Sequence, residues 1–180
     1  MLYSFNDCIK KYNNQYQIEK KVQEGKLYKI EKGIYSDQKQ VSDLGIIAFK
    51  YPYAVFTMNS AFYYYGLTDV IPERFYLATN RNATKIHSNN IKQFFYYENI
   101  LQVGITTIIY QNVKIQIYEK ERMLIELIRN KNTLPFDYYK EIIESYRKII
   151  YELDIEKIQE YILLFPKSDY IMNVIQLEVL

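Results

Sequence analysis

Amide and ammonium side chains are concentrated near the start of the chain. Eight of the side chains between residues 14 and 32 concern us here: Asn14, Gln15, Gln17, Lys20, Lys21, Lys26, Lys29 and Lys32. Asn and Gln can form paired hydrogen bonds with adenine edges in the major groove of DNA, whereas Lys reaches guanine or a backbone phosphate. These residue types point to nucleic-acid binding, and we take the eight as candidate DNA-binding residues.

A short polar helix is expected to carry the first five of these candidates. Asn13 or Asn14 can cap its first turn, because an Asn side-chain oxygen accepts hydrogen bonds from unpaired backbone amides. Ile18 and Val22, with Tyr16 nearby, predict a narrow apolar stripe facing the core. Gly25 stands where a helix typically ends in a left-handed residue.

A hairpin is expected to follow and to carry the remaining three lysines. Residues 27 to 32 alternate in polarity as in a strand with one buried face, and Lys32-Gly33 predicts a tight turn. With a preceding helix over Ser4–Tyr12, this pattern is typical of a winged helix-turn-helix. Little room remains before Ser4 for a first supporting helix, so the module is truncated or borrows packing from elsewhere. The alternative is a solvated helix and hairpin in an ordinary domain.

The residues that usually carry catalysis are scarce. The chain has one Cys and one His, nearly eighty residues apart, and its five Gly residues are scattered singly. Cys8 falls on an apolar stripe and is expected to pack, while His87 is expected in a polar loop with Arg81 and Lys85. We therefore expect no catalytic residues, no metal ligands and no cofactor. An enzyme that uses the Arg81–His87 loop is the minor alternative.

Composition and charge indicate an intracellular protein with a basic end. The chain has 180 residues and is 49% hydrophobic, with no apolar run that approaches a membrane span. A single Cys excludes an internal disulfide, which fits a reducing cytoplasm. Residues 1 to 35 carry a net charge of +3, within an overall charge of +2. The 21 Tyr residues suggest base stacking or, more simply, an AT-rich genome.

The rest of the chain predicts an α+β body. We expect a winged helix-turn-helix over residues 1–37 and a body over 38–180. The body begins with a linker helix at 42–51, continues with a small sheet at about 74–118 and ends with a helical bundle at 119–180. The strands lie close in sequence, so an antiparallel meander is the simplest pairing. Residues 141 to 180 carry eight acidic and four basic side chains, which suggests a partner-facing tail or a solvated outer face.

Four blocks, in order, resemble the AbiEi family, the antitoxin and transcriptional regulator of bacterial toxin–antitoxin and abortive-infection systems. They are Ile18–Tyr35, similar to the family's recognition helix and wing; Ser60–Pro72; Arg74–Thr79; and Tyr118–Asn130, similar to its E-R-T-L-x-D-L helix. The chain departs from that last pattern at Met123 and Glu126, where the family usually has Thr and Asp.

The resemblance implies a cytoplasmic, phage-defence protein without a cofactor. Such a protein would bind inverted repeats in its own promoter and repress its operon. It would also counteract a cognate nucleotidyltransferase-like toxin. A homodimer would match the inverted repeats, and no membrane partner is expected. The alternative is a protein-interaction module that neutralises a partner without reading DNA.

Overall fold

The computed structural model describes every residue from Met1 to Leu180, and these pack into two compact units. The first is Met1–Pro52 and the second is Tyr53–Leu180. The sequence placed the division after residue 37. The first unit is longer because it includes helix α3 (Asp43–Lys50), whose Lys50 ammonium lies 2.7 Å from the Glu31 carboxylate. Its predicted start is confirmed, since the Ser42 hydroxyl accepts from the Gly45 amide.

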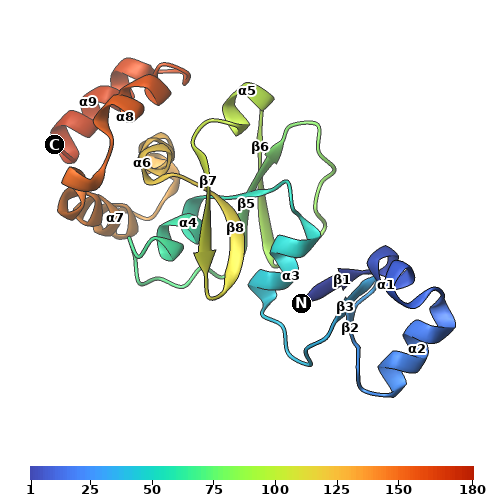
Figure 1. Cartoon of the computed structure of the whole chain (residues 1–180). Helices are drawn as coiled ribbons and strands as arrows, with labels where there is room; N and C mark the ends of the chain where they lie inside the picture. Colours follow the sequence, from blue (N-terminus) through green and yellow to red (C-terminus); the bar gives the residue numbers. More distant parts are fainter. The chain divides into compact units, whose positions relative to one another are not determined.

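The first unit has the element order β-α-α-β-β before α3 (Figure 1). Its elements are β1 (Leu2–Ser4), α1 (Phe5–Tyr12), α2 (Gln15–Gln23), β2 (Tyr28–Glu31) and β3 (Ile34–Ser36). Strand β3 is central and pairs antiparallel with both neighbours. The residues before Ser4 therefore form a sheet strand, which supplies support that the sequence did not reveal.

Local signals in the sequence position both short helices. Ser4 and Asp7 form a reciprocal capping box at the start of α1, and the Asn14 side chain accepts from the Gln17 amide at 2.9 Å to cap α2. Gly25 follows α2 with a φ of +67°, a left-handed conformation that a side chain would penalise. The predicted helix boundaries are thus confirmed.

The core of the first unit draws one residue from each of four elements or turns. Cys8, Ile18, Leu27 and Tyr35 pack together, and the partly buried side chains around them belong to Tyr3, Ile9, Tyr12 and Val22. Cys8 is fully buried, as predicted, and burial raises the pKa of its thiol. This core fixes α1 and α2 against the sheet, so α2 can present only its opposite face to solvent.

A five-stranded sheet forms the centre of the second unit. Its strands are β4 (Val55–Phe56), β5 (Phe75–Asn80), β6 (Ile91–Tyr96), β7 (Ile105–Tyr110) and β8 (Val113–Tyr118), in the order β6-β5-β4-β8-β7. Strands β5–β6 and β4–β8 run parallel, whereas β4–β5 and β7–β8 run antiparallel.

The expected antiparallel meander is therefore wrong for this sheet. The small, wholly antiparallel sheet in the protein is the one formed by β1, β2 and β3. In the larger sheet, two-residue β4 occupies the centre and separates β5 from β8. So short an apolar segment gives almost no periodic signal in the sequence, and without it adjacent strands look like direct partners.

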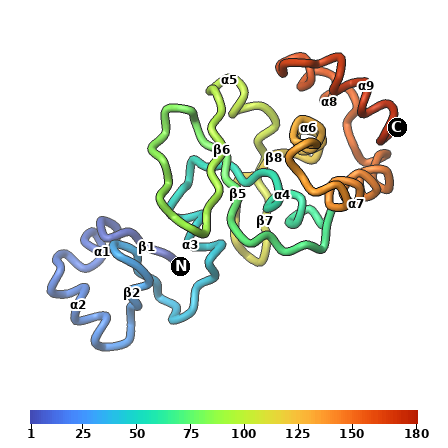
Figure 2. The backbone as a smooth tube through the Cα atoms, turned by 180° about the vertical axis from the view of Figure 1, so that it is seen from behind, coloured from blue at the N-terminus to red at the C-terminus, as the bar shows by residue number.

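Helices occupy the remainder of the second unit. They are α4 (Met58–Tyr64), α5 (Glu98–Leu101), α6 (Lys120–Arg129), α7 (Phe136–Lys148), α8 (Ile155–Ile162) and α9 (Ser168–Glu178). Both views show α6 enclosed by α7, α8 and α9 (Figures 1 and 2). The predicted C-terminal helices and the α+β class are confirmed. No helix has the length and apolarity that crossing a membrane requires.

Helix α6 carries a buried ion pair. Arg122 and Glu126 both have side chains that are 0% exposed, with Arg122 Nη2 2.6 Å from Glu126 Oε1. Arg122 Nη1 also donates to the Ile100 carbonyl at 3.0 Å, and the guanidinium lies over the ring of Phe165 at 4.3 Å. Arg129 Nη1 donates to both Glu126 oxygens at 3.0 Å. The pair thus joins α6 to the α5 segment and to the α8–α9 turn.

Gly104 makes room for this arrangement. Its φ is +70°, and a Cβ built there would lie 2.7 Å from the Arg122 Cβ. Its carbonyl accepts from the Glu119 amide at 2.7 Å just before α6 begins. Any side chain at this position would push against α6, so glycine is needed for both its conformation and its size.

Removing one partner of the buried pair should destabilise the second unit strongly. We expect Glu126→Ala to lower the free energy of unfolding by about 3–5 kcal/mol, because Arg122 would remain buried without its counter-charge. Urea denaturation followed by circular dichroism measures the change. The control is Glu160→Gln on the exposed face of α8, which should stay within about 0.5 kcal/mol. A loss for Glu126→Ala as small as that of the control would contradict this account.

Candidate nucleic-acid interface

Helix α2 has one buried and one outward face. Ile18 is 1% exposed and Val22 is partly buried against the core. At 3.6 residues per turn, Tyr16, Lys20 and Gln23 share the opposite face. Tyr16 is 70% exposed. The expectation that Tyr16 joins the apolar stripe is therefore wrong, because it lies half a turn away from Ile18.

The amide candidates at the start of α2 are mostly engaged within the protein. The Asn14 oxygen caps the helix, and Gln15 Nε2 donates to Glu19 Oε1 at 2.8 Å. Gln17 is only partly exposed. Of the three, Gln17 is the one whose side-chain amide makes no hydrogen bond within the protein and could contact a ligand directly.

Two of the lysine candidates share one carboxylate. Lys21 Nζ and Lys26 Nζ each lie 3.0 Å from Glu24 Oε2, at the junction between α2 and the hairpin. The hydrogen bonds from Lys26 and Lys21 lower the pKa of Glu24 to about 2. Glu24 therefore stays ionised and neutralises part of the local positive charge.

The other three lysine candidates are exposed and form no ion pair. Lys20 lies on the outward face of α2, Lys29 on the exposed side of β2, and Lys32 in the hairpin turn. The turn is closed by the Glu31–Ile34 pair, and Gly33 adopts a φ of +80° as predicted. These three ammonium groups are available to an external anion.

Two residues on the outward face of α2 are not among the eight candidates expected from the sequence. Tyr16 and Gln23 are exposed beside Lys20. The i, i+4, i+7 spacing of the three residues was the signal that could have identified them. The face thus presents a phenol, an ammonium group and an amide, which together can contact phosphates and base edges.

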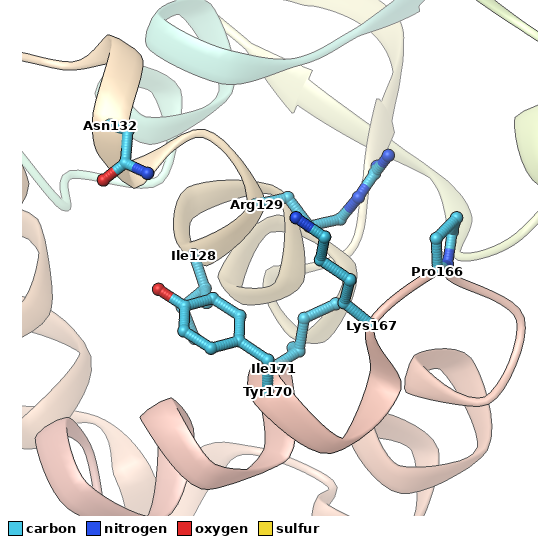
Figure 3. A pocket seen from close by; sticks show the side chains of 7 residues that line it. All are labelled: Ile128, Arg129, Asn132, Pro166, Lys167, Tyr170 and Ile171. Atoms are coloured by element: carbon cyan, nitrogen blue, oxygen red, sulfur yellow. The ribbon is translucent and has the colours of Figure 1, made fainter.

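The second unit contains a pocket between the end of α6 and the start of α9 (Figure 3). Its lining includes Arg129, Lys167 and Tyr170. Figure 3 shows the Arg129 guanidinium turned away from the Tyr170 ring, in keeping with its bonds to Glu126. Lys167 is the one cation of this lining without a carboxylate partner. The pocket therefore presents one unpaired positive charge, that of Lys167, to a ligand.

The shared carboxylate at the α2–hairpin junction can be tested by NMR titration. We expect the Glu24 carboxyl to titrate at a pKa of about 2 and to return toward its ordinary value of 4.5 in Lys21→Ala/Lys26→Ala. Because the pKa of Glu24 is lowered, the stabilisation that this contact gives the folded state is fully present above about pH 4.5. It is lost as the pH falls through about 2. Lys20→Ala is the control, since Lys20 does not touch Glu24. A Glu24 pKa that is the same in both variants would refute the contact.

Comparison with known proteins adds a likeness in fold. No protein-family model matches the chain, and no curated protein matches it. Among solved structures, the chain is similar to the crystal structure of the RV2827C protein from Mycobacterium tuberculosis, with a TM-score of 0.67. The match covers 96% of this chain and 71% of that chain at 10% sequence identity. At this identity the likeness concerns the fold alone.

Proposed function

We propose that this protein is a DNA-binding antitoxin and autorepressor of a toxin–antitoxin operon. In this proposal β1 to β3 with α1 and α2 form a winged helix-turn-helix, α2 is the recognition helix and the β2–β3 hairpin is the wing. The protein binds inverted repeats in its own promoter as a homodimer and counteracts a nucleotidyltransferase-like toxin. The AbiEi-like blocks in the sequence support the operon context.

The observation that carries the DNA-binding part is the placement of unpaired cations. Lys20 is exposed on the outward face of α2, and Lys29 and Lys32 are exposed on the hairpin that follows directly. Residues 1–52 contain nine Lys and six acidic residues, a net charge of +3. A recognition helix docks in the major groove, where Gln17 and Gln23 can read adenine edges. The wing lysines then approach backbone phosphates.

DNA binding should depend on salt and on the wing. We expect the wild-type chain to bind the duplex upstream of its own gene, with affinity that falls as salt rises. Lys29→Ala/Lys32→Ala should lower the slope of log K against log [salt] by about 1.8, because each contact releases about 0.9 counterion. Fluorescence anisotropy over a salt series measures both slopes.

A charge-matched control distinguishes contacts made by the hairpin lysines from the general effect of removing positive charge. Lys140→Ala/Lys148→Ala removes two exposed lysines of α7 that form no ion pair, and should leave the slope unchanged. Equal slopes for the wing variant and wild type, or no salt-dependent binding at all, would refute the repressor part of the proposal.

The toxin-directed part is assigned to the second unit. Leu163, directly after α8, is 78% exposed, and Leu177 of α9 is 74% exposed. Exposed leucines can each contribute apolar area to a contact with a protein partner. They also support the alternative, a protein-interaction module that neutralises a partner without reading DNA.

Neutralisation should be separable from DNA binding. In cells that express the product of the adjacent gene, Lys20→Ala/Lys29→Ala/Lys32→Ala should still rescue growth while losing repression of a promoter fusion. Leu163→Asp/Leu177→Asp should lose rescue, and Ile71→Asp, at a loop position that is 72% exposed, is the matched control. Full rescue by Leu163→Asp/Leu177→Asp would contradict the assignment. Repression retained by the lysine variant would contradict the separation.

A further inference from the structure

Strands β5 and β6 and the loop between them form an acid-free basic segment. Residues 74–97 contain two Arg, two Lys and the single His, with no Asp or Glu. The whole second unit, by contrast, has 14 basic and 15 acidic residues, a net charge of −1. Positive charge is therefore concentrated on this segment, although the unit as a whole is slightly negative.

The segment is folded into an open groove of about 550 Å³ beside β6, which we call the β6 groove. Strand β6 lies at one edge of the sheet. Arg74, Lys85, His87 and Lys92 line the groove, all four are exposed, and none forms an ion pair. No carboxylate belongs to the lining. The groove thus presents unneutralised cations to whatever enters it.

Hydrogen bonds to one side chain hold the loop over β6. Gln93 Oε1 accepts from the Ile86 amide at 2.8 Å, and Gln93 Nε2 donates to the Thr79 hydroxyl at 2.8 Å and to the Thr84 carbonyl. Lys85 and His87 flank Ile86, so these bonds fix the backbone that carries both. The groove is preorganised, which reduces the entropy lost on binding.

Exposed aromatic rings follow the same strand. Phe95 is 44% exposed and lines the groove, and Tyr97 is 62% exposed two residues later. Alternate residues of an extended chain point to the same side, about 7 Å apart. The Arg81 guanidinium lies 4.6 Å from the centre of the Tyr97 ring. Flat rings beside free cations can stack with bases while the cations hold phosphates.

The length of the segment indicates a polymeric ligand. Strands β5 and β6 pair over six residues, from Phe75–Ile91 to Asn80–Tyr96, a span of about 20 Å. Arg74 and Lys92 stand at one end, and Arg81 stands at the other. Cations at both ends of this span are too far apart for one small anion, whereas a nucleic-acid strand carries a phosphate on every nucleotide and can reach both.

We propose that the β6 groove binds single-stranded nucleic acid. Arg74 and Lys85 contact the backbone phosphates, and bases stack on Phe95 and Tyr97. A single strand is favoured over a duplex because bases within a duplex are already stacked on each other and cannot lie against protein rings. The inference goes beyond the proposed repressor function, because it uses none of the residues assigned to operator binding.

The test uses the full chain with its wing disabled. In a Lys20→Ala/Lys29→Ala/Lys32→Ala background, fluorescence anisotropy measures the binding of labelled deoxyuridine and uridine 12-mers. We expect Phe95→Ala/Tyr97→Ala to weaken binding about 10-fold or more through lost stacking. We expect Arg74→Ala/Lys85→Ala to lower the salt slope by about 1.4, at ~0.7 per contact for single strands.

Matched variants and competitors make the outcome decisive. Tyr151→Ala and Lys148→Ala remove a fully exposed ring and an exposed cation elsewhere in the second unit and should change nothing. Phe95→Leu keeps an apolar side chain without a ring, so its loss of affinity would identify stacking rather than unfolding. Tighter binding of either 12-mer identifies the preferred sugar and supports the proposal. No binding in this background, equal competition by a 12-base-pair duplex, or equal losses in the controls would overturn it.

Discussion

The buried pair of Arg122 and Glu126 is the constraint on which the second unit depends. Two charges removed from water are tolerated only when their remaining donors and acceptors are satisfied. Arg122 achieves this through the Ile100 carbonyl and three aromatic rings, and Glu126 through Arg129. Because the partners come from the α5 segment, β6, β8, α6 and the α8–α9 turn, these segments can hold the pair only when all are in place. The polar pair thereby specifies one arrangement of an otherwise apolar bundle.

The first unit has only a small core, and it nevertheless leaves several of its lysines unpaired. Its hairpin and helices bury few side chains, so capping contributes much of the local order: Ser4 with Asp7, Asn14 at α2, and Gly25 after it. The lysines of this unit fall into a paired and an unpaired group. Glu24 neutralises Lys21 and Lys26, whereas Lys20, Lys29 and Lys32 face solvent. The division separates lysines that hold the structure from lysines that can hold a ligand.

Free cations also mark the β6 groove, and there the supporting residue is uncharged. Gln93 is held by three hydrogen bonds and positions the loop without neutralising Lys85. A carboxylate could have made one of these bonds, but it would have cancelled the positive charge. Both candidate surfaces therefore combine local order from backbone and amide hydrogen bonds with ammonium groups left unpaired.

The sequence by itself determined the local features of this protein. Caps, glycine turns and apolar periodicity located α1, α2, the hairpin and the C-terminal helices, because each depends on residues close together in the chain. Long-range partners were decided only by the tertiary structure. Two-residue β4 lies at the centre of the sheet and β1 pairs with β3. The sequence could not indicate either pairing, because neither is marked by a local pattern of residues. Arg122 and Glu126 are spaced like an ordinary surface pair, and only the packing of distant helices over α6 buried them. Only the tertiary structure placed Tyr16 and Phe95 on candidate surfaces, since exposure depends on what the rest of the chain covers.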